Sequence, residues 1–384
     1  MNLSLLTKSS CEKIIDLDFP KNIETIVSNN LSALVDNMLI ASKKQINLTH
    51  YEPDIYLLKN VFINFDENLN NVFDSKFQHD VKLMTEVYGF KMNINDQIIN
   101  INILTTNNKK GYVVALIHAI NTFCHMFPYE YHGLTMYICL DDNTRNIDFD
   151  PSNYSLDDMF KRLHKESGAF NVSGMTQRSS KKIVLTKSEE IVKLMFHEMV
   201  HYIGLDQKLL SINKSYNWNL INQRLNISEA YTEFLSVLLN SSYEAIYFMV
   251  STDSNVHNTF QKILSKETTY SVWLSSYILK LYGYNSHNLH EFFSGQNLQP
   301  KYSPIPSWEY IILRTQLLLN INEMNEFFPE NLKINNLNLD KFLSLIEINN
   351  DFIELIKSFI FSITNLRKNI SYNLIDINWN CLLV

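Results

Sequence analysis

Residues 186–206 of the chain read Thr-Lys-Ser-Glu-Glu-Ile-Val-Lys-Leu-Met-Phe-His-Glu-Met-Val-His-Tyr-Ile-Gly-Leu-Asp. Apolar residues recur in this stretch at the spacing of a helical face, which predicts a helix over Ser188–Leu205. Thr186 and Glu189 have the spacing of a capping box, with Ser188 as a competing N-cap. Any chemistry carried by the polar residues of this stretch is therefore expected on a helix.

His197, Glu198 and His201 form an H-E-x-x-H pattern within the predicted helix. Positions four residues apart share a helix face, so both imidazoles can bind one Zn²⁺ through bonds of ~2.0–2.1 Å. Glu198 lies beside them and is placed to act as a general base toward water. The pattern also arises on helices by chance. Because a catalytic zinc site needs three protein ligands, a third ligand decides between the two interpretations.

The first candidate for the third ligand follows the motif directly. Gly204, a natural stop for the helix, is in register with the longer pattern H-E-x-x-H-x-x-G-x-x-H or -D. Gln207 stands where that pattern requires a ligand, and Asp206 falls one position early. This candidate is therefore the weaker one.

The second candidate is a pair of acids, Glu229 and Glu233, at the start of a long apolar helix predicted over Ser228–Val250. The pair shares one helix face, so one carboxylate can bind the metal while the other accepts the N–H of a ligating histidine. Two solvated acids in a first helical turn, favoured by the helix dipole, are the alternative interpretation. After an H-E-x-x-H, metal binding is the favoured one.

The rest of the sequence divides into three regions. Residues 1–86 are mainly helical and of unknown role, residues 87–206 form an α+β lobe that ends in the H-E-x-x-H helix, and residues 207–384 form a large, mainly helical lobe. In the middle region we expect strands at Tyr88–Ile94, Gln97–Leu104, Leu134–Leu140 and Lys182–Thr186, and helices at Gly111–Phe127 and Ser155–His164. Elsewhere we expect helices at Ile23–Ala41, Tyr270–Tyr282, Ser307–Asn320 and Phe342–Ile363.

Composition excludes several classes of protein. The 384 residues carry a net charge of -7, which argues against a general nucleic-acid binder. Only 8 Gly and 8 Pro favour helices over turn-rich β structures. The 4 Cys are widely spread, so we expect reduced, mostly buried thiols in a reducing compartment. The sequence shows neither a signal peptide nor an apolar run long enough for a membrane span, and we expect an intracellular protein.

The H-E-x-x-H pattern followed by E-x-x-x-E resembles the gluzincin class of zinc metallopeptidases. Such enzymes have a sheet whose edge strand binds substrate, then the H-E-x-x-H helix, then a helical lobe that supplies a glutamate ligand. A longer likeness, to zincin-like proteins of large DNA viruses, covers roughly residues 130–240. It rests on the segments Phe170–Thr176, Lys182–Thr186 and Glu189–Asp206.

The resemblance implies an α+β fold with a zincin-like mixed sheet lobe, and one Zn²⁺ per chain. It implies zinc ligands at His197, His201 and Glu229, a general base at Glu198, and at Glu233 an outer carboxylate that orients a ligand. It also implies that Lys182–Thr186 is the edge strand, so that a peptide or protein substrate binds along Lys182, Ile183, Val184 and Leu185. The loop Asn171–Thr176 either borders the cleft or is an ordinary Ser/Gly turn.

The activity implied is zinc-dependent hydrolysis of a peptide bond. Zinc activates a water, Glu198 takes its proton and delivers it to the leaving amine, and one further donor assists the oxyanion. Nothing in the sequence chooses that donor among Tyr270, His287 and His290. Two alternatives stay open: a catalytically degenerate zincin that serves as a structural or binding protein, such as a virion component, and zinc-dependent cleavage of a non-peptide amide. The Asn and Lys excess agrees with a viral protein in host cytoplasm or a virion.

Overall fold

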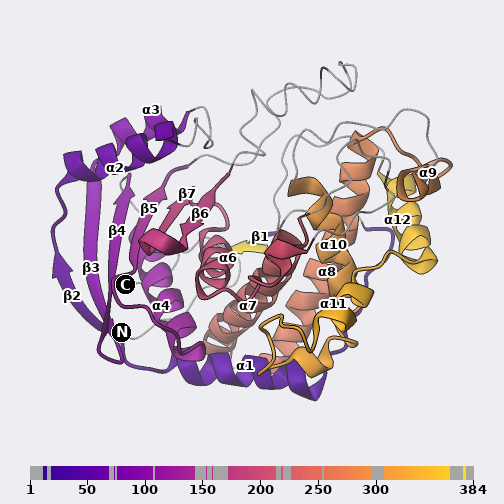
Figure 1. The fold of residues 1–384 in the computed structure, drawn as a ribbon, viewed down its shortest axis with the longest axis horizontal. Helices are drawn as coiled ribbons and strands as arrows, with labels where there is room; N and C mark the ends of the chain where they lie inside the picture. Colours follow the sequence, from indigo (N-terminus) through magenta and orange to yellow (C-terminus); the bar gives the residue numbers. More distant parts are fainter. Residues whose placement is uncertain are drawn as a thin grey trace.

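The computed structural model describes residues 12–14, 19–68, 73, 76–106, 109–142, 153, 158, 172–212, 218, 226–252, 255–295, 307–363 and 375–377. Within these residues a six-stranded mixed sheet lies beside a group of long helices (Figure 1). This mixed α/β arrangement agrees with the α+β class expected from the sequence. The helix expected at Ser155–His164 lies outside the described residues, Asp158 excepted.

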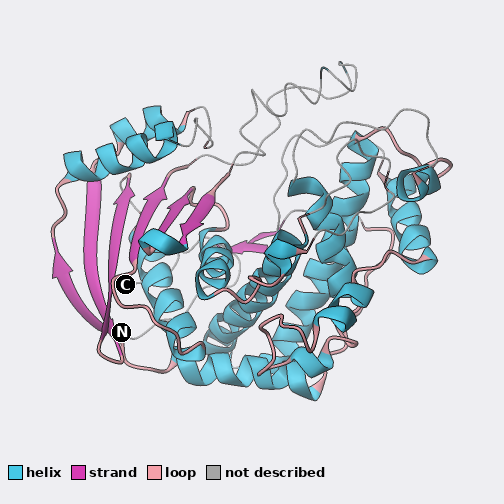
Figure 2. Cartoon of the chain, in the orientation of Figure 1, coloured by secondary structure: helices cyan, strands magenta, loops and turns pink. Residues whose placement is uncertain are grey.

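The sheet has the strand order β2-β3-β4-β5-β7-β6. Strands β4, β5 and β7 run parallel to one another, whereas β2 and β3 on one side and β6 on the other pair antiparallel with their neighbours. The strands are β2 (Asn47–Tyr51), β3 (Glu86–Ile94), β4 (Gln97–Thr105), β5 (Thr135–Leu140), β6 (Gly174–Gln177) and β7 (Lys182–Thr186). Figure 2 shows them as a single layer with helices against it.

The predicted hairpin between the third and fourth strands is confirmed. Asn95 and Asp96 connect β3 to β4 with φ angles of 48° and 65°. Two successive residues with positive φ are typical of a two-residue hairpin turn, which Asn and Asp tolerate better than most residues. The strands expected at Leu134–Leu140 and Lys182–Thr186 are also confirmed, as β5 and β7.

The prediction that Lys182–Thr186 is the edge strand is wrong. Strand β7 lies between β5 and β6, with Gly174 opposite Leu185 and Gln177 opposite Lys182. The side chains of Ile183, Val184 and Leu185 are buried on both faces of the sheet, so they offer no surface along which a substrate could bind. Among the described residues the edge strand on this side is β6, whose short sequence Gly-Met-Thr-Gln lacks the apolar alternation typical of a strand.

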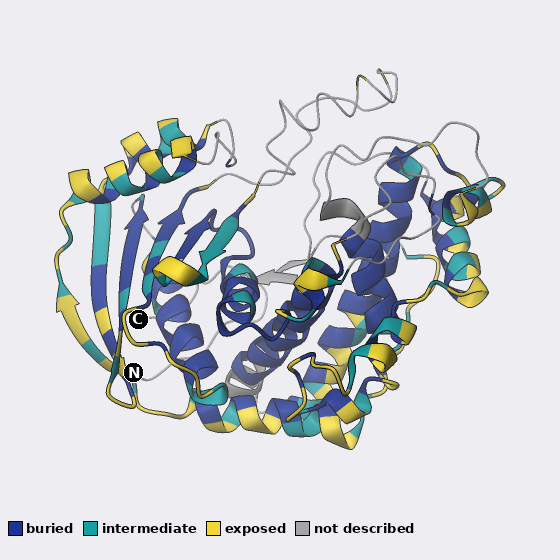
Figure 3. Cartoon of the chain, in the orientation of Figure 1, coloured by how far each residue is buried: buried dark blue, intermediate teal, exposed yellow. Residues whose placement is uncertain are grey.

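The two faces of the sheet build two cores, because side chains alternate along each strand. One face carries Ile101, Ile138 and Leu185 and packs against α4 (Lys110–Met126) and α6 (Ile191–Ile203). The other face carries Leu104, Cys139 and Val184 and is covered by α2 (Ile55–Asn68) and α3 (Phe77–Leu83). In Figure 3 strands β4, β5 and β7 and the central helices are mostly dark blue, whereas much of α2 and α3 is yellow.

The helices beyond the sheet gather around α7, which packs against α6, α8, α10 and α1. Helix α7 corresponds to the helix predicted at Ser228–Val250. Buried residues occur on most of its faces. Helix α8 begins well before the predicted Tyr270, and the predicted Phe342–Ile363 is two helices rather than one. The bounds are α1 (Asn29–Ser42), α7 (Ile227–Thr252), α8 (Val256–Leu281), α9 (Leu289–Ser294), α10 (Ser307–Leu319), α11 (Leu339–Leu345) and α12 (Asn350–Ser362).

The region before residue 87 contributes to this fold in several places. Strand β2 extends the six-stranded sheet, α1 packs against α4, and α2 with α3 covers one sheet face. A separate two-stranded sheet pairs β1 (Glu12–Ile14) with β8 (Ile375–Ile377). Three short 3₁₀ turns complete the described elements, at Arg178–Ser180, Leu209–Ser211 and Asn325–Phe327.

Two of the four cysteines lie in the described residues. Cys124 and Cys139 are buried and free, and burial raises the pKa of each thiol above its ordinary value. This confirms the expectation of buried thiols at these two positions. No helix in the described part of the chain combines the length and apolar character that a membrane span requires.

Candidate metal centre

Helix α6 carries the H-E-x-x-H pattern, and its start differs from the prediction. The helix begins at Ile191, after Glu190 with a φ of 57°, and no side chain caps it. The predicted capping box is absent because both hydroxyls bond elsewhere: Thr186 Oγ1 donates to the carbonyl of Ser173 at 3.0 Å and Ser188 Oγ to that of Asp141 at 2.6 Å. These bonds tie the start of α6 to neighbouring segments.

The end of α6 is as predicted. Gly204 adopts a left-handed conformation, with a φ of 69°, and its N–H bonds to the carbonyls of Val200 and His201. A glycine accepts this conformation without the steric penalty of a Cβ. His201 therefore stands in the last turn of a helix that is fixed at both ends.

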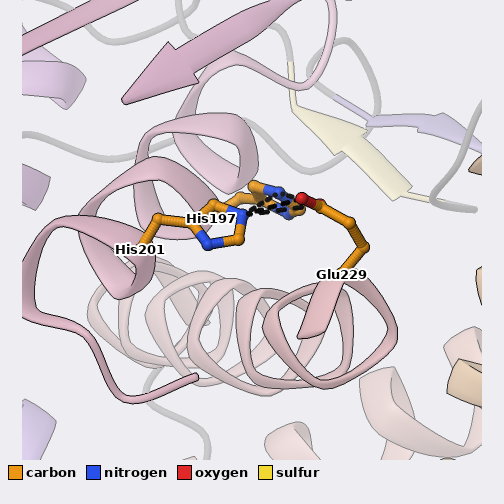
Figure 4. A group of neighbouring side chains, drawn as sticks. All are labelled: His197, His201 and Glu229. Atoms are coloured by element: carbon orange, nitrogen blue, oxygen red, sulfur yellow. Dashed lines mark hydrogen bonds and ion pairs between the residues drawn. The ribbon is translucent and has the colours of Figure 1, made fainter. Parts of the chain in front are cut away.

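Three side chains converge beside α6: His197 and His201 from α6 and Glu229 from α7 (Figure 4). Nε2 of His197 lies 3.2 Å from Nε2 of His201, and Oε2 of Glu229 lies 3.1 Å from the first nitrogen and 3.4 Å from the second. Ligand atoms ~2.0–2.1 Å from a tetrahedral zinc are ~3.3 Å apart. The spacing of the three donor atoms therefore fits one zinc ion.

Each histidine is held at its other ring nitrogen by a buried carboxylate. Nδ1 of His197 lies 2.9 Å from Oε2 of Glu233, and Nδ1 of His201 lies 2.8 Å from Oδ2 of Asp206. Since a carboxylate accepts, Nδ1 is the donor in both rings, and Nε2 faces the other ligands. Metal-binding histidines show this arrangement, in which the outer carboxylate fixes the tautomer and the ring orientation.

Asp206 has a role that the sequence did not reveal. The sequence pattern offers it only as a third ligand, but its carboxylate lies on the Nδ1 side of His201, away from the converging donor atoms. Ser228 Oγ donates a further hydrogen bond to Oδ2 of Asp206, which is 2% exposed. After Gly204 the chain folds back toward the last turn of α6, which brings Asp206 to His201. A sequence pattern does not show that reversal.

Glu198 faces strand β6. Oε2 of Glu198 accepts a hydrogen bond of 2.7 Å from Thr176 Oγ1. A Cβ added to Gly174 would lie 2.6 Å from Oε1 of Glu198, so the strand approaches the carboxylate as closely as a glycine permits. Of the segment Asn171–Thr176, the residues from Gly174 onward thus border the site as a strand, and Asn171 lies outside the described residues.

The buried position of Glu198 affects its protonation. Burial raises the pKa of the Glu198 carboxyl above its ordinary value, against the opposing effect of His197, His201 and the hydrogen bond from Thr176. A carboxylate with a raised pKa is a better proton acceptor near neutral pH. The surroundings of Glu198 therefore suit a general base.

The charges around the three converging side chains shift their pKa values in opposite directions. Burial lowers the pKa of His197, but hydrogen bonds to Glu229 and Glu233 outweigh it and raise the pKa to about 9. For Glu229, burial raises the pKa, but the charge of His201 and the hydrogen bonds from both histidines hold it below the usual range of a carboxyl. The carboxylates around the two imidazoles thus favour positive charge at this position, which is the charge a metal cation brings.

The three converging side chains are partly exposed. The side chains of His197, His201 and Glu229 are 10%, 16% and 29% exposed, in contrast to the 2% of Glu233. Structural zinc sites are closed by four protein ligands, whereas catalytic sites leave a coordination position accessible. Partial exposure of the ligands fits the second kind of site.

The three candidates for an additional oxyanion donor differ in their exposure to solvent. Tyr270 is 1% exposed within α8, and burial raises the pKa of its hydroxyl. His287 and His290 are exposed around the start of α9. A role of Tyr270, His287 or His290 in stabilising an oxyanion stays a prediction.

Neither a family model nor a solved structure gives a match to this chain. The residue geometry described above is therefore the basis for assigning a function.

Proposed function

We propose that this protein is a zinc-dependent peptidase of the gluzincin type. The observation that carries the proposal is the convergence of His197, His201 and Glu229 at distances that fit one zinc ion, with Glu198 next to them on α6. The zincin-like plan is supported by the element order, in which the antiparallel strand β6 is followed by β7, the H-E-x-x-H helix α6 and the glutamate-bearing helix α7. Two histidines and a carboxylate are a ligand set of known catalytic zinc sites.

Zinc held by these three side chains supplies Lewis acidity, which activates water and polarises the carbonyl of a substrate. Glu198 accepts the proton of the attacking water and passes it to the leaving nitrogen as the C–N bond breaks. Thr176 holds the Glu198 carboxylate in place for both transfers through its 2.7 Å hydrogen bond. Glu233 and Asp206 hold the two imidazoles in orientation.

The peptide is proposed to bind along β6 rather than along β7. Strand β6 is the edge of the sheet among the described residues, and its Gly174 and Thr176 lie against Glu198. An extended peptide adds to a sheet edge through main-chain hydrogen bonds, which places a scissile bond beside the strand. A protein or peptide substrate, and an intracellular location, are part of this proposal.

The experiment that tests the proposal is metal analysis of the purified protein followed by hydrolysis of a peptide library. We expect about one zinc per chain in the wild type, loss of that zinc in His201→Ala, and zinc-dependent cleavage by the wild type. Glu198→Gln is the matched control, because it leaves the three ligands in place. A protein that binds zinc but cleaves no peptide would instead be a degenerate zincin with a structural or binding role, or an enzyme for another amide.

A further inference from the structure

The two oxygens of the Glu233 carboxylate have different partners. Oε2 lies 2.9 Å from Nδ1 of His197. Oε1 accepts one hydrogen bond from Nη1 of Arg314 at 3.1 Å and another from Nζ of Lys193. The carboxylate thus faces a proposed zinc ligand on one side and two cations on the other.

These charged side chains come from three helices and are buried. Lys193 lies on α6, Glu233 on α7 and Arg314 on α10, and their side chains are 5%, 2% and 0% exposed. Arg314 also donates from Nη2 to Ser271 Oγ on α8 at 3.0 Å, which fixes the plane of the guanidinium. The three side chains are shielded from bulk solvent, so the direction in which the Glu233 carboxylate points depends on these protein groups.

The geometry restricts rotation of the carboxylate. Turning Oε2 away from His197 would move Oε1 away from both cations. This would break charge-assisted hydrogen bonds, which are stronger than hydrogen bonds between neutral groups. Lys193 precedes His197 by four residues on α6, so the ammonium and the imidazole lie on the same helix face. One cation therefore comes from the helix that carries the ligand, and the other from a helix distant in sequence.

We propose that Lys193 and Arg314 are positioning residues of the metal centre. They hold Oε1 of Glu233 so that Oε2 stays against Nδ1 of His197, and this keeps Nε2 of His197 directed at the metal. The inference rests on the proposed function only in requiring that His197, His201 and Glu229 bind zinc. It assigns α10, which supplies no ligand, a part in building the site.

The test is zinc affinity, measured by competition with a chelator, in Lys193→Met, Arg314→Met and Glu233→Gln. Loss of an outer partner of a metal-binding histidine lowers metal affinity by ~10–100-fold, and we expect a loss in that range for each variant. Lys341→Met is the matched control, since it removes a cation from an exposed pair with Glu326. Affinities are measured at a temperature where circular dichroism shows each variant folded, and Arg314→Lys replaces Arg314→Met should the latter not fold.

Two readouts separate positioning from a merely structural role. The visible absorption spectrum of the Co²⁺-substituted protein should change in Lys193→Met, because the orientation of a ligand changes. In a double-mutant cycle, Glu233→Gln with Lys193→Met should lose no more zinc affinity than Glu233→Gln alone, since both changes act through one carboxylate. Additive losses, or variants that are less stable but bind zinc with wild-type affinity and spectrum, would overturn the inference.

The outcomes also distinguish this inference from the proposed function. A wild type that binds zinc but cleaves no peptide would contradict the proposed peptidase activity. The positioning role of Lys193 and Arg314 could still be tested through zinc affinity. A wild type that binds no zinc overturns both.

Discussion

Thr176 on the edge strand donates a 2.7 Å hydrogen bond to Glu198 on α6. The same hydroxyl lies 2.9 Å from the main-chain carbonyl of Glu198, so one residue of β6 contacts both the backbone and the carboxylate of the proposed base. Strand β6 and the H-E-x-x-H helix are thereby fixed relative to each other. A peptide along β6 would lie next to the carboxylate that is proposed to take a proton from the attacking water and pass it to the leaving nitrogen.

The close approach at Gly174 predicts that Gly174→Ala impairs hydrolysis without removing zinc. The added Cβ would lie 2.6 Å from Oε1 and 2.9 Å from Cγ of Glu198, so the carboxylate must shift. We expect kcat to fall by at least ~10-fold, since misplacement of a catalytic group by about 1 Å costs up to ~100-fold. The measurement is kcat with zinc content on the same sample. Met175→Ala, on the other face of β6, is the control, and an equal effect of both would contradict the prediction.

Thr176→Val should change the pH dependence of hydrolysis. The hydrogen bond from Thr176 stabilises the ionised carboxylate, so it lowers the pKa of Glu198. Without it that pKa rises, the base becomes protonated at higher pH, and the acidic limb of kcat/KM moves to higher pH. Full pH–rate profiles of both proteins test this. Ser180→Ala, an exposed hydroxyl just beyond β6, should leave the profile unchanged.

Glu198→Gln should keep the zinc and lose most of the hydrolysis. A glutamine has the shape of glutamate but accepts no proton, and a positioned general base contributes ~10²–10⁴-fold to a rate. We expect kcat to fall within that range while zinc content stays at the wild-type level. Full peptidase activity in this variant would rule out Glu198 as the base.

Asp206→Asn should weaken zinc binding. The carboxylate accepts from Nδ1 of His201 at 2.8 Å, and the amide carries no charge to orient that ring. Loss of such an outer partner lowers metal affinity by ~10–100-fold. Chelator competition measures the affinity, and Asp142→Asn is the control because that side chain is 68% exposed. An unchanged affinity in Asp206→Asn would show that His201 needs no outer carboxylate.

Phe62→Ala should destabilise the fold without affecting the metal centre. Phe62 is 0% exposed and packs against Phe77 and Tyr137, in the core on the sheet face away from α6. Truncating a buried phenylalanine costs ~3–5 kcal/mol in free energy of unfolding. Tyr56→Ala on the same helix, where the side chain is 76% exposed, should change stability by less than ~0.5 kcal/mol. Denaturant unfolding and zinc titration measure the two effects separately.

The elements with a strong local signal were predictable. The hairpin around Asn95 and Asp96, helix α4 and helix α7 follow from turn chemistry and apolar periodicity, which act over a few residues. The start of α6 was not predictable, because Thr186 and Ser188 bond to carbonyls of distant segments instead of capping the helix. Strand β6 was not predictable either, because four residues without apolar alternation become a strand only by pairing with β7.

The sequence by itself determined the pair His197 and His201, because four residues on a helix bring two side chains to one face whatever the rest of the fold does. It also made Glu229 the leading third ligand, through the acids at the start of α7. The outer role expected of Glu233 agrees with its contact to Nδ1 of His197. Only the tertiary structure decided that Asp206 holds the imidazole of His201, that Gly174 and Thr176 lie against Glu198, and that Arg314 reaches Glu233 from α10. Asp206 reaches His201 through the reversal of the chain after Gly204, and the other contacts join segments distant in sequence. Their geometry is set by the packing of helices and sheet rather than by local periodicity.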